Sequence, residues 1–246
     1  MQWRLFVVGI GVYAVALAAT VPATLADGLV REASGGRLRL AAVQGTLWSG
    51  AGQIELRTEG EDSGLTKRLT WHLQPKSWLH ATLTYAVVTD QEPRPITVTI
   101  SWSRIQFENI DISMPAWALG IAVPRLSSLE LTGEIQLRAN SLSFGRNDTQ
   151  GSATLQWQVA GSTLTPVSPL GSYELRLVGE GPSVHAALNT LQGPLQLDGQ
   201  GSWGNDRKPV FIASARMPPQ FRQQLAPFLR MIAIERDDGS FALQIK

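Results

Sequence analysis

The sequence predicts a mainly β protein. A single N-terminal transmembrane helix is expected to precede one large, curved antiparallel β-sheet domain, folded over on itself, with one short C-terminal helix. Three observations predict this fold class. An uncharged apolar run lies near the start, apolar and polar residues alternate from residue 36 to the end, and a helix-spaced apolar stripe lies in residues 219–232. With 43% hydrophobic and 17% charged residues, the chain of 246 residues has enough apolar side chains for a sizeable core.

The apolar segment begins at Leu5 and ends at Ala26. As a helix, about 22 residues at 1.5 Å each reach ~33 Å, enough to cross the hydrocarbon core of a bilayer. Trp3 stands where an interfacial aromatic residue would lie, and Arg4 marks the flank of the segment. A cleaved signal peptide is the alternative, because residues 24–26 resemble a small-x-small cleavage site. We therefore expect residues 1–26 to form a tail and transmembrane helix, and residues 27–246 to form the β domain.

Alternation with a period of two dominates the rest of the chain. In residues 79–87 and 96–102, for example, one face of each strand would be buried and the other would meet water, as in antiparallel sheets. Trp71, Trp102 and Trp157 fall in the apolar phase and are expected in the core. Turn signals divide the chain into a meander of roughly ten or more strands. The clearest turn signals are residues 59–64, 90–95, 145–151, 179–182, 204–209 and 238–239.

Helices are expected to be few and short. Residues 115–119 could form a turn or two of helix before Pro124. Pro227 should bend or shorten the better helix, in residues 219–232. We interpret this second helix as a plug for an open end of the sheet, with partner binding as the alternative. The apolar residues on its one helical face are Phe221, Leu225, Phe228, Leu229 and Ile232.

No residue pattern points to catalysis, to a cofactor or to a metal. The chain has no Cys, and His72 and His80 have no acidic neighbour on the same strand face that would suggest a metal cluster or a proton relay. Residues 199–204 match G-x-G-x-x-G by letter, but no helix follows to bind a pyrophosphate. The net charge is +1 without a basic stripe, so nucleic-acid binding is not expected. These observations favour a structural or binding role.

The most distinctive segment reads Val-Gln-Gly-Thr-Leu-Trp-Ser-Gly, at residues 43–50. Gly45 and Gly50 would let the backbone bend sharply while Trp48 turns inward at the edge of the sheet. We interpret Gly45, Thr46, Trp48 and Gly50 as a structural bend, with a docking site for a partner protein as the alternative.

This segment resembles protein N of the type II secretion system, an inner-membrane component of the bacterial machine that exports folded proteins through the outer membrane. The resemblance implies a cytoplasmic N-terminus, one span and a periplasmic β domain. It thereby supplies the orientation that the arginines on both sides of the span leave open. It also implies no enzymatic activity and no catalytic residues. The amphipathic strands further resemble the curved sheets of AsmA-like envelope proteins. Other segments that resemble the secretion family, in order, are residues 69–75, 126–137, 169–173, 193–199 and 225–243.

The expected function is that of a non-enzymatic component of the type II secretion machinery, anchored in the bacterial inner membrane and contributing to assembly or export. Its expected partners are other inner-membrane components of that system, with the secretin as a further candidate. The alternative is an AsmA-like envelope protein that binds or shuttles lipid on an apolar concave sheet face. A periplasmic hydrolase with Trp-lined subsites is a third hypothesis.

Overall fold

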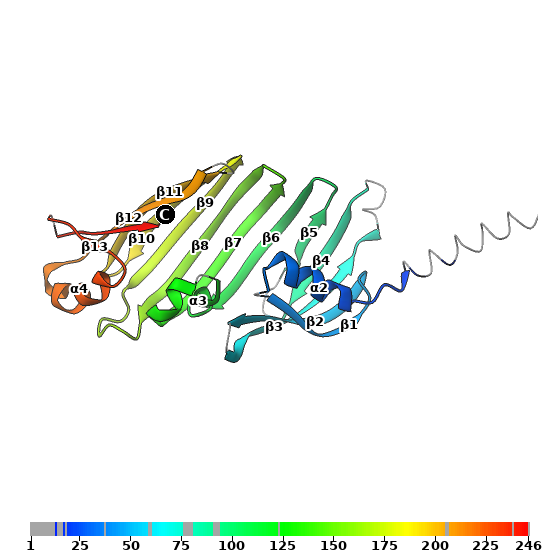
Figure 1. Ribbon diagram of the computed structural model, residues 1–246, viewed down its shortest axis with the longest axis horizontal. Coiled ribbons are helices and arrows are strands. Elements are labelled where there is room, and N and C mark those ends of the chain that lie inside the picture. Colours follow the sequence, from blue (N-terminus) through cyan, green and yellow to red (C-terminus); the bar gives the residue numbers. More distant parts are fainter. Residues whose placement is uncertain are drawn as a thin grey trace, which may run out of the picture. The chain divides into compact units, whose positions relative to one another are not determined.

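The computed structural model describes residues 13, 17, 19–36, 38–58, 61–75, 81–90, 94–122, 124–204, 207–237 and 239–245. Within these residues lie fourteen strands and a few short helices, and the strand pairs are antiparallel (Figure 1). The predicted mainly β, antiparallel fold is therefore confirmed, whereas the folding of the sheet over itself stays a prediction. The chain divides into two compact units, Met1–Pro95 and Ile96–Lys246, which we describe in turn.

Unit 1 contains a short helix followed by four described strands that pair in the order of the sequence. They are α2 (Thr24–Ala33), β1 (Leu38–Gly45), β2 (Ser49–Thr58), β3 (Glu61–Leu73) and β4 (Leu83–Thr89). Ala23, Leu40 and Trp71 are buried in one cluster, which confirms the predicted burial of Trp71. The turn predicted at residues 59–64 is shorter than expected, because Glu61 already pairs with Thr58 across the hairpin.

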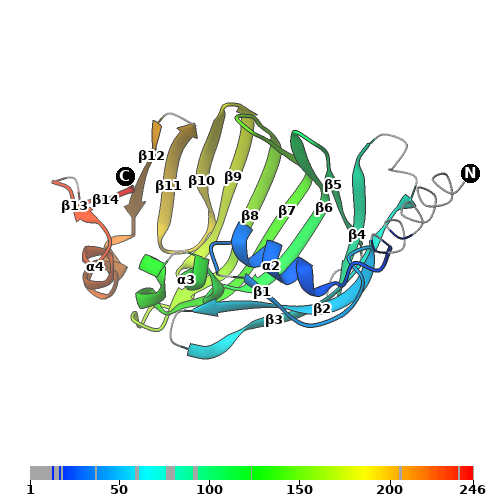
Figure 2. The same ribbon diagram turned by 45° about the vertical axis from the view of Figure 1, so that its right-hand side comes forward.

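Unit 2 contains ten strands among its described residues, again paired in sequence order except that the last strand lies between the two before it. They are β5 (Ile96–Ile100), β6 (Arg104–Pro115), β7 (Leu131–Gly145), β8 (Thr149–Ser162), β9 (Gly171–Gly181), β10 (Ser183–Gln192), β11 (Gln196–Gly204), β12 (Arg207–Arg216), β13 (Ile234–Glu235) and β14 (Phe241–Ile245). Strands β6 to β11 lie side by side along their length (Figures 1 and 2). The turns predicted at residues 145–151, 179–182 and 204–209 are confirmed, because β7, β9 and β11 end at these places.

Short helices join some of these strands. The helix α3 (Ala118–Ala122) and the 3₁₀ helix η2 (Pro124–Leu129) connect β6 to β7, and the 3₁₀ helix η3 (Pro219–Phe221) leads from β12 into α4 (Arg222–Arg230). Leu225, Phe228 and Leu229 of α4 are buried in one cluster with Ile135 of β7 and Phe241 of β14. The predicted C-terminal helix therefore packs against apolar sheet residues.

This helix is shorter than predicted, and Ile232 does not join its buried face. The α-helix ends at Arg230, and Ile232 is 36% exposed, because the chain turns there to begin β13 at Ile234. Pro227 lies inside the helix, next to buried Ala226 and Phe228, and is itself exposed. The helix thus accommodates Pro227 on its solvent-exposed side, away from the residues that pack against the sheet.

The other two tryptophans expected in the core are less buried than Trp71. Trp157 is half-buried: its indole lies 5.9 Å from the ring of Tyr173, and its Nε1 donates to the carbonyl oxygen of Thr132 at 2.9 Å. Tyr173 is buried, which raises the pKa of its hydroxyl, and that hydroxyl donates to the carbonyl of Leu195 at 2.9 Å. The expectation for Trp102 is wrong, because β5 ends at Ile100 and Trp102 lies in the following turn, fully exposed.

The predicted membrane segment lies mostly outside the described residues. Trp3, Arg4 and Leu5 are among those not described, and among the described residues no helix is both long and apolar enough to span a bilayer. The end of the segment is described: Ala26 lies in α2, and Ala23 just before this helix is buried at 1% exposure in the core of unit 1. The span and the domain boundary at residue 26 stay predictions.

Glu235 of β13 contacts residues at both ends of α4, and we expect these contacts to make the stability of the fold depend on pH. Its carboxylate accepts hydrogen bonds from Arg222 at 2.8 Å and from Arg230 at 2.9 Å, and these bonds lower the pKa of Glu235. Because the folded-state pKa is depressed, the ion pairs stabilise the fold above the unfolded-state pKa, and this stabilisation is lost as the pH falls through the folded-state pKa.

We therefore expect Glu235→Gln to flatten the decline in unfolding temperature between neutral and acid pH, measured by circular dichroism. Asp237→Asn, which changes a nearby exposed carboxylate, is the matched control and should leave the decline in place. An identical pH profile for Glu235→Gln and the wild type would contradict a role for this contact.

Candidate interaction site at the 45–50 turn

The connection between β1 and β2, residues 45–50, is a tight turn that we call the 45–50 turn. Gly45 pairs with Gly50 across its base. Inside it, the Thr46 amide donates to the carbonyl oxygen of Ser49 at 2.9 Å, and the Ser49 amide donates to the Thr46 hydroxyl at 3.2 Å. Gly45 has a φ of +93°, a conformation that residues with a Cβ rarely adopt. The turn therefore requires glycine at its first position.

Trp71 connects the turn to the core of unit 1. The indole Nε1 of Trp71 donates to the carbonyl oxygen of Thr46 at 3.2 Å. A Cβ on Gly50 would overlap the indole ring of Trp71 and would come within 2.5 Å of the carbonyl oxygen of Gln44. The Trp48 carbonyl oxygen accepts from the amide of Leu73 at 2.7 Å. These contacts make the turn a rigid platform rather than a free loop.

The chain before α2 forms part of the same structure. Pro22 makes a bridge with Thr46. The amide of Leu47 donates to the carbonyl oxygen of Val21 at 2.9 Å, and the amide of Ala23 donates to that of Gly45 at 3.2 Å. Residues 21–23 therefore flank the 45–50 turn through an isolated β-bridge and two backbone hydrogen bonds, although they belong to the last part of the predicted membrane segment.

Helix α2 then covers the outer edge of β1. The carboxylate of Asp27 accepts a hydrogen bond from the amide of Leu40 at 2.8 Å, and the hydroxyl of Ser34 accepts one from the amide of Leu38 at 3.0 Å. An uncovered edge strand offers its backbone groups to other chains. Here two of these N–H groups donate to side chains at the two ends of α2. The helix therefore covers this part of the edge of β1.

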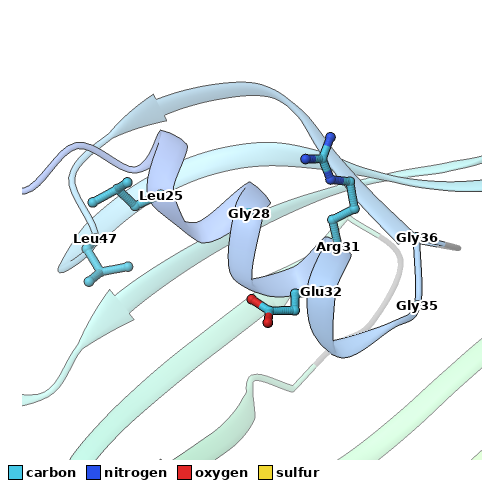
Figure 3. Close-up of a pocket in the computed structure, with 7 residues that line it drawn as sticks. All are labelled: Leu25, Gly28, Arg31, Glu32, Gly35, Gly36 and Leu47. Atoms are coloured by element: carbon cyan, nitrogen blue, oxygen red, sulfur yellow. The ribbon is translucent and has the colours of Figure 1, made fainter.

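A groove of about 840 Å³ lies beside α2 and the 45–50 turn (Figure 3). Leu25 of α2 and Leu47 of the turn lie close together at one end of it (Figure 3). Leu25 is 57% exposed, whereas an apolar side chain of this size is more often covered. Arg31 and Glu32 add one charge of each sign. The residues that line this α2 groove are Leu25, Gly28, Arg31, Glu32, Gly35, Gly36 and Leu47.

The α2 groove suits the binding of a partner through apolar contacts. One positively charged and one negatively charged side chain are also among its lining residues. Within the described part of the chain, no group of three or more His, Cys, Asp or Glu could hold a metal ion. His72 is exposed, and its Nδ1 lies 3.3 Å from the hydroxyl of Ser49; His185 is also exposed, and His80 lies outside the described residues. A partner would find two apolar side chains on a rigid support.

Part of this site was predicted from the sequence. The structure places Gly45, Thr46, Trp48 and Gly50 together in one turn, with Trp48 half-buried. It also adds residues 21–36, which were predicted to belong to the membrane segment as far as residue 26 and to the β domain from residue 27. Pro22 was the available signal, because a proline in an apolar run commonly marks a break in regular structure.

The contact between Asp27 and β1 predicts a stability effect. Asp27→Ala would leave the half-buried amide of Leu40 without its acceptor, so we expect the free energy of unfolding to fall by about 1–3 kcal/mol. Asp27→Asn keeps a side-chain carbonyl oxygen and should lose clearly less. Denaturant titration measures both losses, and amide hydrogen exchange at Leu40 should accelerate in Asp27→Ala alone. Equal losses in the two variants would show that charge, not hydrogen bonding, makes the contact.

Comparison with known proteins identifies the chain. The family model of the type II secretion system (T2SS), protein N, matches residues 36–244. The chain belongs to the type II secretion system protein N family. This confirms the family that the sequence resembles, and membership indicates a role in type II secretion through contact with other components of that machinery. The matched residues include the 45–50 turn and nearly all described strands, but not α2. No curated protein and no solved structure gave a significant match.

Proposed function

We propose that this chain is a non-enzymatic component of the type II secretion machinery, held at the bacterial inner membrane by its N-terminal segment with its β domain in the periplasm. In this role it contributes to assembly of the machine, or to export of folded proteins across the outer membrane. The observation that carries the secretion role is the family match over residues 36–244. The uncharged apolar residues 5–19 support the anchor.

We further propose that the α2 groove is where another inner-membrane component of the system binds, with the secretin as a second candidate partner. Exposed apolar residues on a rigid support are typical of interaction sites, because burying them on binding needs little reordering. Leu25 and Leu47 provide the apolar contact. Residues 21–23 tie the groove directly to the proposed anchor, so the groove would lie near the membrane and within reach of other membrane components.

Co-purification from cells tests this function. The full chain, affinity-tagged and extracted in mild detergent, should carry other inner-membrane secretion components with it. The double variant Leu25→Gln and Leu47→Gln should reduce their recovery about tenfold, as expected when the central contacts of an interface are removed. Val88→Gln, which changes an exposed apolar residue of β4 outside the groove, should leave recovery unchanged.

Two results would count against the proposal. Failure to recover any secretion component with the wild-type chain would contradict the assembly role. Equal recovery with the groove variant and with the Val88→Gln control would leave the assembly role intact but would remove the groove from it.

A lipid-binding function remains the alternative hypothesis, and the packing of unit 2 speaks against one form of it. Leu225, Phe228 and Leu229 of α4 already occupy the apolar sheet face around Ile135 and Phe241. An acyl chain would have to displace these side chains to reach that part of the sheet. Mass spectrometry of the purified full chain would favour the alternative if it found a lipid in stoichiometric amount.

A further inference from the structure

A second exposed apolar surface lies in unit 2, where the β5–β6 and β7–β8 hairpins turn at the same end of the strands (Figure 2). Trp102 at the tip of the first hairpin is 102% exposed. Ile100, Ile105 and Phe144 beside it are 38%, 41% and 42% exposed, and all four residues line one hollow of about 640 Å³ together with Arg146. We call these five residues the hairpin-tip patch.

The patch is held by ordered contacts, so its exposure is a feature of the fold. The amide of Ser101 donates to the carbonyl oxygen of Arg104 at 2.9 Å and closes the first hairpin. The guanidinium of Arg104 pairs with Asp148 and donates to the hydroxyl of Ser143 at 3.1 Å, which fixes the first hairpin to the second. The ring of Phe144 meets that of Phe107 edge to face, with centroids 6.0 Å apart.

The charges of the patch do not cancel. Asp148, the acidic residue of the second hairpin tip, is already paired with Arg104. Arg146, in the same tip, is exposed and forms no ion pair with any other described residue. The surface therefore combines an exposed indole, three partly exposed apolar side chains and one guanidinium, that of Arg146, which pairs with no carboxylate of the described residues.

We propose that the hairpin-tip patch binds the surface of a lipid bilayer that contains anionic lipids. Trp102 would lie at the level of the headgroups, where tryptophan is enriched in membrane proteins, and Arg146 would pair with a lipid phosphate. Ile100, Ile105 and Phe144 would reach the boundary of the acyl chains, as apolar residues of interfacial segments do.

The exposure of Trp102 favours a bilayer over a protein partner. Tryptophans that dominate protein interfaces lie in well-packed pockets at the centre of the contact. Trp102 is not packed against any described residue, so a protein would have to supply the whole pocket, whereas a headgroup region accepts a single indole without a preformed shape. The proposal does not depend on the secretion role, because it needs only a membrane surface near unit 2.

Site-specific labelling of the full chain tests the proposal, and the absence of native Cys makes each introduced thiol unique. Ser103→Cys, next to Trp102, carries an environment-sensitive nitrobenzoxadiazole label. Gln196→Cys is the matched control, because Gln196 is exposed and begins β11 at the opposite end of the strands. Both labelled chains are reconstituted into phosphatidylcholine vesicles with or without phosphatidylglycerol. Quenching by doxyl lipids present in both leaflets reports contact with the bilayer.

We expect quenching at position 103 to exceed that at position 196 about threefold in vesicles with phosphatidylglycerol, and to decrease at high salt. In the Ser103→Cys background, Trp102→Ala should reduce quenching to the level of the control, and Arg146→Gln should remove the preference for phosphatidylglycerol. Circular dichroism should show the same fold for every variant, because the changed side chains are exposed.

Equal quenching at positions 103 and 196 in both kinds of vesicle would overturn the proposal. It would also be overturned if the label at position 103 became shielded only after other secretion proteins were added, because the patch would then be a protein interface. Quenching at position 103 that persisted in Trp102→Ala would assign the contact to the label and not to the patch.

Discussion

Replacing Phe241 with alanine is expected to lower the free energy of unfolding of unit 2 by about 3–5 kcal/mol. Phe241 is fully buried at 0% exposure. It lies in the cluster that joins β14 to α4, together with Leu225 and Leu229, which are also almost fully buried. Truncation would remove a large apolar surface and leave a cavity between the helix and the sheet. Denaturant titration followed by tryptophan fluorescence measures the change.

The control for this prediction is the same substitution on an exposed residue. Phe144 is 42% exposed and makes one edge-to-face contact, so Phe144→Ala should lower the free energy of unfolding by only about 1 kcal/mol. If both phenylalanines gave equal losses, the burial of Phe241 under α4 could not be the source of its effect.

Gly50→Ala is expected to destabilise unit 1 by about 3 kcal/mol, at the upper end of the range for an overpacked core. The added methyl group would overlap the Trp71 ring and approach the Gln44 carbonyl oxygen to 2.5 Å, and neither can yield without disturbing the 45–50 turn. Because Trp71 also donates to Thr46, the strain would spread through the turn. Thermal unfolding of the full chain, with fluorescence as the readout, tests the effect.

Gly28→Ala is the matched control and should have the opposite sign. Gly28 lies in α2, and nothing lies within 4 Å of the position that its Cβ would take. Alanine is favoured over glycine in a helix by about 1 kcal/mol, so the variant should be slightly more stable than the wild type. Destabilisation by Gly28→Ala as large as that by Gly50→Ala would mean that local crowding does not explain the result.

The strands were predictable because, in a sheet with one buried face, apolar and polar residues alternate along each strand. Trp71 shows the strength of this signal, and Trp102 shows its limit. Alternation reports the side of the strand on which a residue would lie, but not the residue at which the strand ends. Trp102 continues the apolar phase of β5 beyond Ile100, where the backbone has already turned. Only the structure shows whether a residue of the apolar phase is buried, as Trp71 is, or exposed, as Trp102 is.

The candidate site was predictable only where its cause is local. Gly45 and Gly50 indicated a turn because the backbone there needs residues without a side chain. The hydrogen bond from Leu40 to Asp27, by contrast, joins residues thirteen apart in the sequence, and no periodic pattern encodes it. The packing of residues 21–23 against the turn was hidden for another reason, since an apolar composition serves a membrane span and a protein core equally well.

Photo-crosslinking from the α2 groove tests the central claim most directly. A benzophenone amino acid at Leu25, in the full chain expressed in cells that carry the secretion system, should capture an inner-membrane secretion component. The same amino acid at Val88, exposed in β4 outside the groove, should not. This result would place a partner of the machine on the groove beside the 45–50 turn. Capture of no secretion component from Leu25, or equal capture from Leu25 and Val88, would contradict the claim.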